Sequence, residues 1–206
     1  MAEYPYLRLE EADGFFTAER YKDAIRCYRE IYCNFPSPSI AYKMSASYQR
    51  LARHLKALKW LEVAISGGLD DADAQNTRGW LYQQLGRSRE AMAAYREALE
   101  HDAGHRAASY NLASLLSRKS ARADWAECVE LCDKLLEAGR DREVEYMRGL
   151  IKVRLGDHDG ALEDANDLVS GFPDYAKGYK ARSIILQVMG IHAAADEDYA
   201  RFLSFF

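Results

Sequence analysis

The cysteines and histidines are the side chains of this sequence best suited to bind a metal. There are four of the first and five of the second. Cys128 and Cys132 are four residues apart, so a helix would place them one turn apart on the same face. A structural zinc site needs four ligands, and no histidine follows this pair at a suitable spacing. We therefore expect no metal site, and we interpret the pair as small core residues and all four cysteines as reduced thiols.

The histidines do not form a catalytic group with other side chains. Four of the five fall at or beside predicted turns, and His101 and His105 lie on either side of Ala103-Gly104, where a helix should end. The sequence contains no glycine-rich phosphate loop. It also lacks a nucleophile with a base and an orienting partner. We expect a protein that is not an enzyme and has no cofactor.

Composition and charge exclude other classes of protein. The net charge of -4 argues against broad attraction to nucleic acid. No apolar run approaches the roughly 20 residues of a membrane span, and residues 1–6 show no secretory signal. We therefore expect a cytoplasmic protein. The basic stretch from Arg118 to Arg122 has two readings: contact with an acidic or phosphate group, or a solubilising turn.

Small residues recur along the chain at a nearly constant interval, with steps of 33, 34, 37, 33 and 34 residues. They are Ala24, Ala57, Ala91, Cys128, Ala161 and Ala195. A second set recurs ahead of them at Ala12, Ser45, Gly79, Ala113, Gly149 and Ser183. A fixed period of this length is typical of stacked repeats. One small residue in each helix of a pair would let two backbones approach closely.

The clearest copy spans residues 72–105. Its two runs, 74–85 and 89–100, have apolar residues at helical spacing. Gly86 lies between them, where a helix needs a left-handed terminating residue. The unit is therefore predicted to be a helix, a tight turn and a second helix.

This pattern resembles the tetratricopeptide repeat family, whose period is about 34 residues. The matching residues of the clearest copy are Gly79, Tyr82, Gly86, Ala91, Tyr95 and Ala98. The resemblance implies an all-α fold, a right-handed superhelical solenoid of about six antiparallel helix pairs in one domain over residues 1–206. The units are expected at about 4–37, 38–71, 72–105, 106–141, 142–175 and 176–206. Local packing in the fourth unit differs, because Cys128 and Cys132 replace the usual alanine and aromatic residue.

In such an array the first helices line a concave surface. Rows tracked through the period bring together tyrosine, tryptophan and arginine, which are enriched at binding hot spots. The predicted partner-binding residues are Tyr42, Arg50, Asn76, Trp80, Gln84, Tyr110, Arg118, Tyr146 and Arg154. Any single tyrosine could instead pack against the next unit. The arginines favour a partner segment with at least one carboxylate.

These features predict an adaptor or scaffold that binds a protein or peptide segment in its concave groove. The alternative is a secretion or assembly chaperone that shields a client protein. Some family members clamp a C-terminal carboxylate with paired lysines and asparagines. The sequence does not favour that role, because only Asn111 matches in type. The other clamp positions carry Ala46, Thr77, Ala107, Glu143 and Met147.

The last residues are strongly apolar. The aromatic side chains of Phe202, Phe205 and Phe206 have more surface than one short chain end can readily bury. We expect them to mediate self-association, as a homo-oligomer, or contact with a partner. The alternative is an exposed patch without a role.

Overall fold

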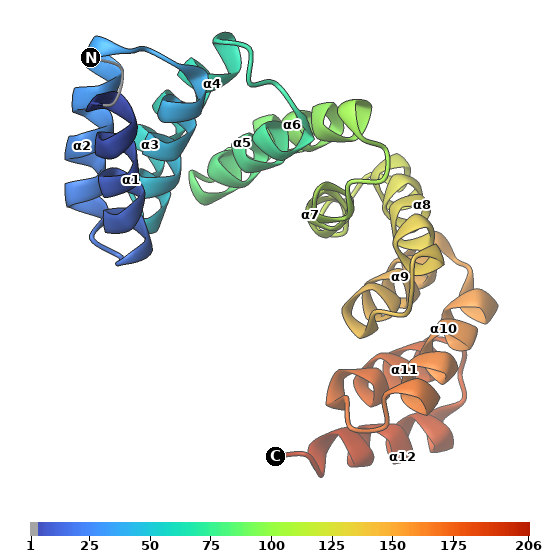
Figure 1. Cartoon of the computed structure of the whole chain (residues 1–206). Coiled ribbons are helices and arrows are strands. Elements are labelled where there is room, and N and C mark those ends of the chain that lie inside the picture. Colours follow the sequence, from blue (N-terminus) through green and yellow to red (C-terminus); the bar gives the residue numbers. More distant parts are fainter. Residues whose placement is uncertain (1–3) are drawn as a thin grey trace. The chain divides into compact units, whose positions relative to one another are not determined.

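The computed structural model describes residues 4–206, with side chains from residue 8 onward. These residues form twelve α-helices and no strand (Figure 1). The predicted all-α fold of about six helix pairs is therefore confirmed. The chain divides into two compact units, Met1–Ala108 and Ser109–Phe206, which we call unit 1 and unit 2 and describe separately. A single domain over residues 1–206 stays a prediction.

Unit 1 contains three helix pairs. Its helices are α1 (Tyr4–Thr17), α2 (Tyr21–Asn34), α3 (Pro38–Arg50), α4 (His54–Ser66), α5 (Ala72–Gln84) and α6 (Ser88–His101). Helices α1 and α2, α3 and α4, and α5 and α6 pack together within pairs, and the second helix of each of the first two pairs also packs on the first helix of the next. The predicted runs 74–85 and 89–100 correspond to α5 and α6, with bounds shifted by one to two residues.

Unit 2 begins within α7 (Arg106–Leu116). Its further helices are α8 (Arg122–Glu137), α9 (Arg142–Leu155), α10 (His158–Gly171), α11 (Ala176–Val188) and α12 (His192–Leu203). The Cys128 thiol donates a hydrogen bond to the Ala113 carbonyl oxygen at 3.4 Å, which links α8 to α7. The first helices α9 and α11 also contact each other directly.

The recurring small residues lie at the closest contacts between helices. The six small residues on the second helices are completely buried. Each of them is 0% exposed: Ala24, Ala57, Ala91, Cys128, Ala161 and Ala195. At Gly79 in α5, an added Cβ would lie 2.5 Å from Cε1 of Tyr95 in α6. Only a residue without a side chain fits there, because the Tyr95 ring already occupies the space.

In five of the six helix pairs, the turn inside the pair contains one left-handed residue; the longer turn between α7 and α8 contains none. Gly86, Gly156 and Gly190 have φ angles of 73°, 88° and 77°. The left-handed conformation expected for Gly86 is confirmed. Glu19 and Ala52 hold the same place in the first two pairs with φ angles of 59° and 53°. A residue with a Cβ is strained there by roughly 1–2 kcal/mol.

Candidate functional site

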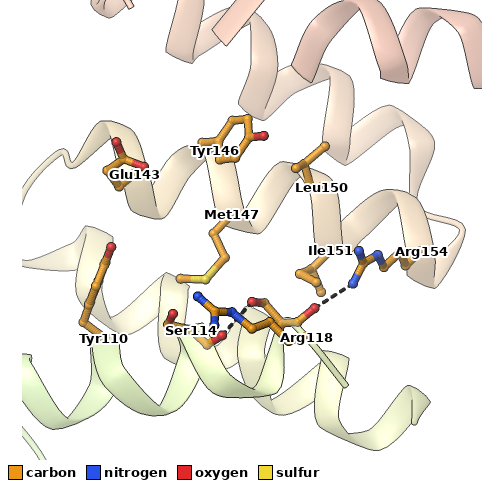
Figure 2. A pocket seen from close by; sticks show the side chains of 10 residues that line it. Tyr110, Ser114, Arg118, Glu143, Tyr146, Met147, Leu150, Ile151 and Arg154 are labelled. Atoms are coloured by element: carbon orange, nitrogen blue, oxygen red, sulfur yellow. Dashed lines mark hydrogen bonds between the residues drawn. The ribbon is translucent and has the colours of Figure 1, made fainter. Parts of the chain in front are cut away.

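A hollow of about 340 Å³ lies between α7 and α9 in unit 2 (Figure 2). Its lining residues come from these two helices and from the turn that follows α7: Tyr110, Ser114, Ser117, Arg118, Glu143, Tyr146, Met147, Leu150, Ile151 and Arg154. Four of the nine predicted partner-binding residues, Tyr110, Arg118, Tyr146 and Arg154, therefore line one cavity. Tyr110 comes from α7, Tyr146 and Arg154 come from α9, and Arg118 lies in the turn directly after α7 rather than on a first helix as expected. Residues one period apart still meet, because they occupy equivalent places in consecutive pairs.

The two tyrosines lie toward one end of the hollow. Tyr110 is 39% exposed on α7. Tyr146 on α9 meets Tyr175 edge to face, with ring centroids 6.4 Å apart, and the Lys177 ammonium lies 5.8 Å from its ring centroid. Figure 2 shows Met147 extending from α9 toward α7, between the tyrosines and the arginines. The floor is therefore apolar and the rim is able to form hydrogen bonds.

The two arginines differ in what holds them. Arg154 donates a hydrogen bond to the Ser117 carbonyl oxygen at 2.6 Å, and its guanidinium carbon lies 5.8 Å from the centroid of the Trp125 ring. This hydrogen bond ties α9 to the end of α7 (Figure 2). Arg118 is exposed, and among the side chains that the structure describes no carboxylate lies within ion-pair distance of it. Its charge is therefore available to a ligand.

The acidic residue of the hollow is already engaged. Glu143 accepts a hydrogen bond from the Lys177 ammonium at 3.3 Å. Burial, followed by the nearby negative charge of Glu143, raises the pKa of the Tyr175 hydroxyl above its ordinary value. Lys177 offsets the carboxylate, so Arg118 and Arg154 leave the hollow electropositive.

A second hollow of about 250 Å³ lies in unit 1. Its lining residues are Asp13, Phe16, Thr17, Tyr28, Tyr42, Lys43 and Ala46. Asp13 accepts hydrogen bonds from the Tyr28 hydroxyl at 2.5 Å and from the Lys43 ammonium at 2.7 Å. Burial and this bond to Asp13 raise the pKa of Tyr28. Tyr42 is the one predicted binding residue in this hollow, where the charges already neutralise each other.

The other predicted residues line neither hollow. Arg50 and Gln84 are exposed at the ends of α3 and α5, and Asn76 is half-buried. Trp80 packs against the core of unit 1, with its ring 5.5 Å from the His54 ring, edge to face. Trp80 therefore presents less surface than its place in the row predicts.

Sequence tracking missed several lining residues. From the sequence alone, Met147 and Glu143 are considered only as positions of the carboxylate clamp of some family members. Ile151 and Ser117 lie outside the rows that contain the predicted binding residues. Ser117 takes part through its backbone carbonyl, which no residue pattern reveals. Ser114 and Leu150 lie one and two periods after Trp80 and could have been found from its row.

The terminal aromatic residues are partly paired with one another. Phe202 and Phe206 meet with centroids 5.4 Å apart, and Phe205 lies 5.8 Å from Tyr179. Phe206 is nevertheless 94% exposed and Leu203 54% exposed. Self-association through Phe202, Phe205 and Phe206 stays a prediction.

The cysteines are unpaired thiols, with Cys27, Cys128 and Cys132 buried and Cys33 exposed. The expected burial of Cys128 and Cys132 is confirmed. The neighbouring Cys128 sulfur, followed by burial, raises the pKa of the Cys132 thiol. Among the described residues, no three His, Cys, Asp or Glu side chains are placed to hold a metal ion. No helix within residues 4–206 has the length and apolar character needed to cross a bilayer.

The family model described as tetratricopeptide repeat matches residues 72–105. No curated protein matches the sequence. Solved structures of similar fold include the C-terminal part of a TPR repeat-containing protein from Cytophaga hutchinsonii, 18% identical, with a TM-score of 0.79 over 96% of this chain and 78% of that one.

A tetratricopeptide repeat protein from Parabacteroides merdae is 19% identical, with a TM-score of 0.79 over 98% of this chain and 80% of that one. YrrB, described as a TPR protein with an unusual peptide-binding site, is 15% identical, with a TM-score of 0.74 over 85% of this chain and 90% of that one. The predicted resemblance is confirmed: the chain contains a tetratricopeptide repeat at residues 72–105 and has the fold of tetratricopeptide repeat proteins.

Proposed function

We propose that the chain is a non-catalytic adaptor that binds a segment of a partner protein in the hollow between α7 and α9. The observation that carries this proposal is Arg118, a guanidinium without a carboxylate partner at the rim of a hollow lined by two tyrosines. Tyrosine and arginine supply contact area and directional hydrogen bonds at interfaces. The peptide-binding site ascribed to a protein of similar fold supports the same kind of ligand.

A random peptide library panned on the immobilised protein tests the proposal. Recovered peptides should bind at least tenfold more weakly to the double variant Tyr110→Ala, Arg118→Ala. The matched control is Tyr199→Ala, Arg89→Ala, which removes the same residue types from exposed positions on second helices. Equal binding by the hollow variant, or no recovered peptide, would contradict the proposal.

We place this adaptor in the cytoplasm, since its four unpaired thiols suit a reducing compartment.

The alternative role, a secretion or assembly chaperone, predicts a client that co-purifies in stoichiometric amount. The exposed Leu203 and Phe206 are the feature that favours it. Light scattering on Phe205→Ser, Phe206→Ser beside the unchanged chain would test whether this end associates with a second copy.

A further inference from the structure

Charged residues are sorted between first and second helices in unit 2. The first helices α9 and α11 carry seven arginines and lysines against two glutamates. The second helices α8, α10 and α12 carry twelve acidic residues against three basic ones. In unit 1 the first helices carry four residues of each sign, and the second helices seven basic against six acidic. Only unit 2 separates charge in this way.

Part of this charge is used inside the helix pairs. Arg148 and Lys152 of α9 both lie within ion-pair distance of Asp164 in α10, at 2.7 and 3.0 Å. Arg182 of α11 contacts Asp198 in α12 at 2.6 Å. These pairs face the second helices, so they contribute little positive charge to the opposite face.

Two of the remaining cations, Arg154 and Lys180, lie with Arg118 on what we call the first-helix face of unit 2. Its residues are Tyr110 and Ser114 of α7, Arg118 of the turn after α7, Tyr146, Leu150 and Arg154 of α9, and Lys180, Ile184 and Val188 of α11. Arg154 is held by a carbonyl oxygen, and Lys180 lies 5.4 Å from the Phe202 ring centroid. In the part of the chain that the structure describes, none of Arg118, Arg154 and Lys180 has a carboxylate within 4.0 Å.

The same face has an apolar end. Ile184 is 39% exposed and Val188 is 52% exposed, one turn apart on α11. Helix α11 contacts α9, where Leu150 lines the hollow. The face therefore changes from basic at Arg118 and Arg154 to apolar at Ile184 and Val188.

We propose that the first-helix face of unit 2 binds an extended acidic segment of a partner protein, with carboxylates on Arg118 and Arg154 and an apolar side chain on Val188. This rests on the proposed function and names the chemistry of its partner. Packed helix axes lie about 8–10 Å apart, and an extended chain advances about 3.3 Å per residue. Each step from one first helix to the next thus takes about three residues. The segment therefore carries two acidic residues three positions apart in its sequence, and an apolar residue three positions after the second of them.

Nucleic acid also carries negative charge, but this face suits it poorly. The cations alternate with Leu150, Ile184 and Val188, which offer a phosphate backbone no hydrogen-bond donor. The basic residues form no continuous track, since Val188 lies one period after Arg154, where an arginine would be needed to extend it. A protein segment uses both the cations and the apolar end.

Fluorescence anisotropy with nine-residue peptides tests this proposal on the full chain. The main probe has glutamates at positions 1 and 4 and leucine at position 7, made in both chain directions. Matched probes replace both glutamates by glutamine, or the leucine by serine, and a ten-residue oligothymidine tests nucleic acid. We expect the main probe to bind in one direction, at least tenfold more tightly than the glutamine probe and severalfold more tightly than the serine probe. Its affinity should fall with added salt.

Three variants assign the binding to this face. Arg118→Ala should weaken the binding of the glutamate probe and leave the binding of the glutamine probe unchanged. Val188→Ser should weaken the binding of the leucine probe and leave that of the serine probe unchanged. Arg89→Ala on α6 is the control and should change neither. Both tested side chains are exposed, so circular dichroism should be unchanged.

The outcomes separate this inference from the proposed function. Panned peptides could bind the hollow while the main probe binds in neither chain direction, or the glutamine and glutamate probes could bind equally. In either case the partner segment is not acidic, and the adaptor role stands. Tighter binding of oligothymidine than of the glutamate probe would also overturn the inference. If no panned peptide depends on Tyr110 and Arg118, both proposals fail together.

Discussion

The two units fill the interior of their helix pairs with different side chains. In unit 1, Tyr28 and Tyr95 are buried and their hydroxyls donate hydrogen bonds to Asp13 at 2.5 Å and Gln83 at 2.9 Å. In unit 2, the corresponding places hold Cys132, Ala165 and the exposed Tyr199, and buried carboxylates form ion pairs between first and second helices. The fold thus requires the small residue at the helix crossing, while its surroundings can be aromatic or ionic.

The largest expected effect is the loss of a buried charge in unit 2. Asp164 has a side chain only 4% exposed and meets Arg148 and Lys152. Asp164→Asn removes the partner of Lys152 and one of the two carboxylates that contact Arg148, the other being Asp133. It should destabilise unit 2 by about 3–5 kcal/mol. Hydrogen exchange measured peptide by peptide would show the loss confined to residues 109–206.

The control is the exposed pair of unit 1. Asp23 contacts Arg20 at 2.7 Å, and Arg20 is 58% exposed. Asp23→Asn should cost less than about 1 kcal/mol, because solvent screens such pairs. Equal losses at Asp164 and Asp23 would show that the buried pair has no special role in unit 2.

A second comparison uses glycines at equivalent places. A Cβ at Gly79 would meet the Tyr95 ring at 2.5 Å, whereas at Gly149 its nearest neighbour, the Asp164 Cβ, lies 3.5 Å away. Gly79→Ala should therefore cost about 1–3 kcal/mol through overpacking. Gly149→Ala should be neutral or stabilising by roughly 0.5–1 kcal/mol, since alanine favours a helix. Urea unfolding of both variants measures the change in the free energy of unfolding, which we expect to be a loss for Gly79→Ala and no loss for Gly149→Ala.

High pH should weaken unit 1 more than unit 2. Burial raises the pKa of Tyr95 above that of an unfolded tyrosine, about 10. The folded state then holds the proton more tightly, so this contribution is complete below pH 10 and is lost as the pH rises above it. Each such tyrosine changes the free energy of unfolding by roughly 1.4 kcal/mol per pH unit in that range.

Tyr28 and Tyr82 in unit 1 also have raised pKa values, each caused first by burial, and Tyr175 has one in unit 2. Thermal midpoints measured between pH 8 and 11.5 should fall less steeply for Tyr95→Phe than for the unchanged chain. A slope that Tyr95→Phe leaves unaltered would exclude this tyrosine as a source.

The sequence predicted the helix pairs well, because their determinants are local and repeated. The small residues at the crossings and Gly86 in its turn follow from spacing alone. The buried ion pairs were not predicted, since an acidic residue such as Asp164 on a polar-looking helix resembles a solvated one. Its partners come from another helix, and only the packed pair brings them within reach.

The hollow was predicted in part for a similar reason. Row tracking found Tyr110, Arg118, Tyr146 and Arg154, because residues one period apart occupy equivalent places. It could not foresee that Trp80 would turn toward His54 and the core of unit 1, since a single row does not reveal which side chains neighbouring pairs cover. The Ser117 carbonyl became a contact because the helix ends there.

The smallest expected effect concerns the turns. Ala52 has a φ of 53°, whereas Gly156 takes the same role in unit 2 with a φ of 88°. Ala52→Gly should stabilise the second helix pair by up to about 1 kcal/mol, because glycine removes a Cβ clash and offsets its own larger unfolded-state entropy. Gly156→Ala should destabilise the fifth pair by a similar amount. Hydrogen exchange in α3 and α4, and in α9 and α10, resolves the two effects. Slower exchange in the first case and faster in the second would show that these short turns require the left-handed conformation, which Glu19 and Ala52 adopt with strain and Gly86, Gly156 and Gly190 without it.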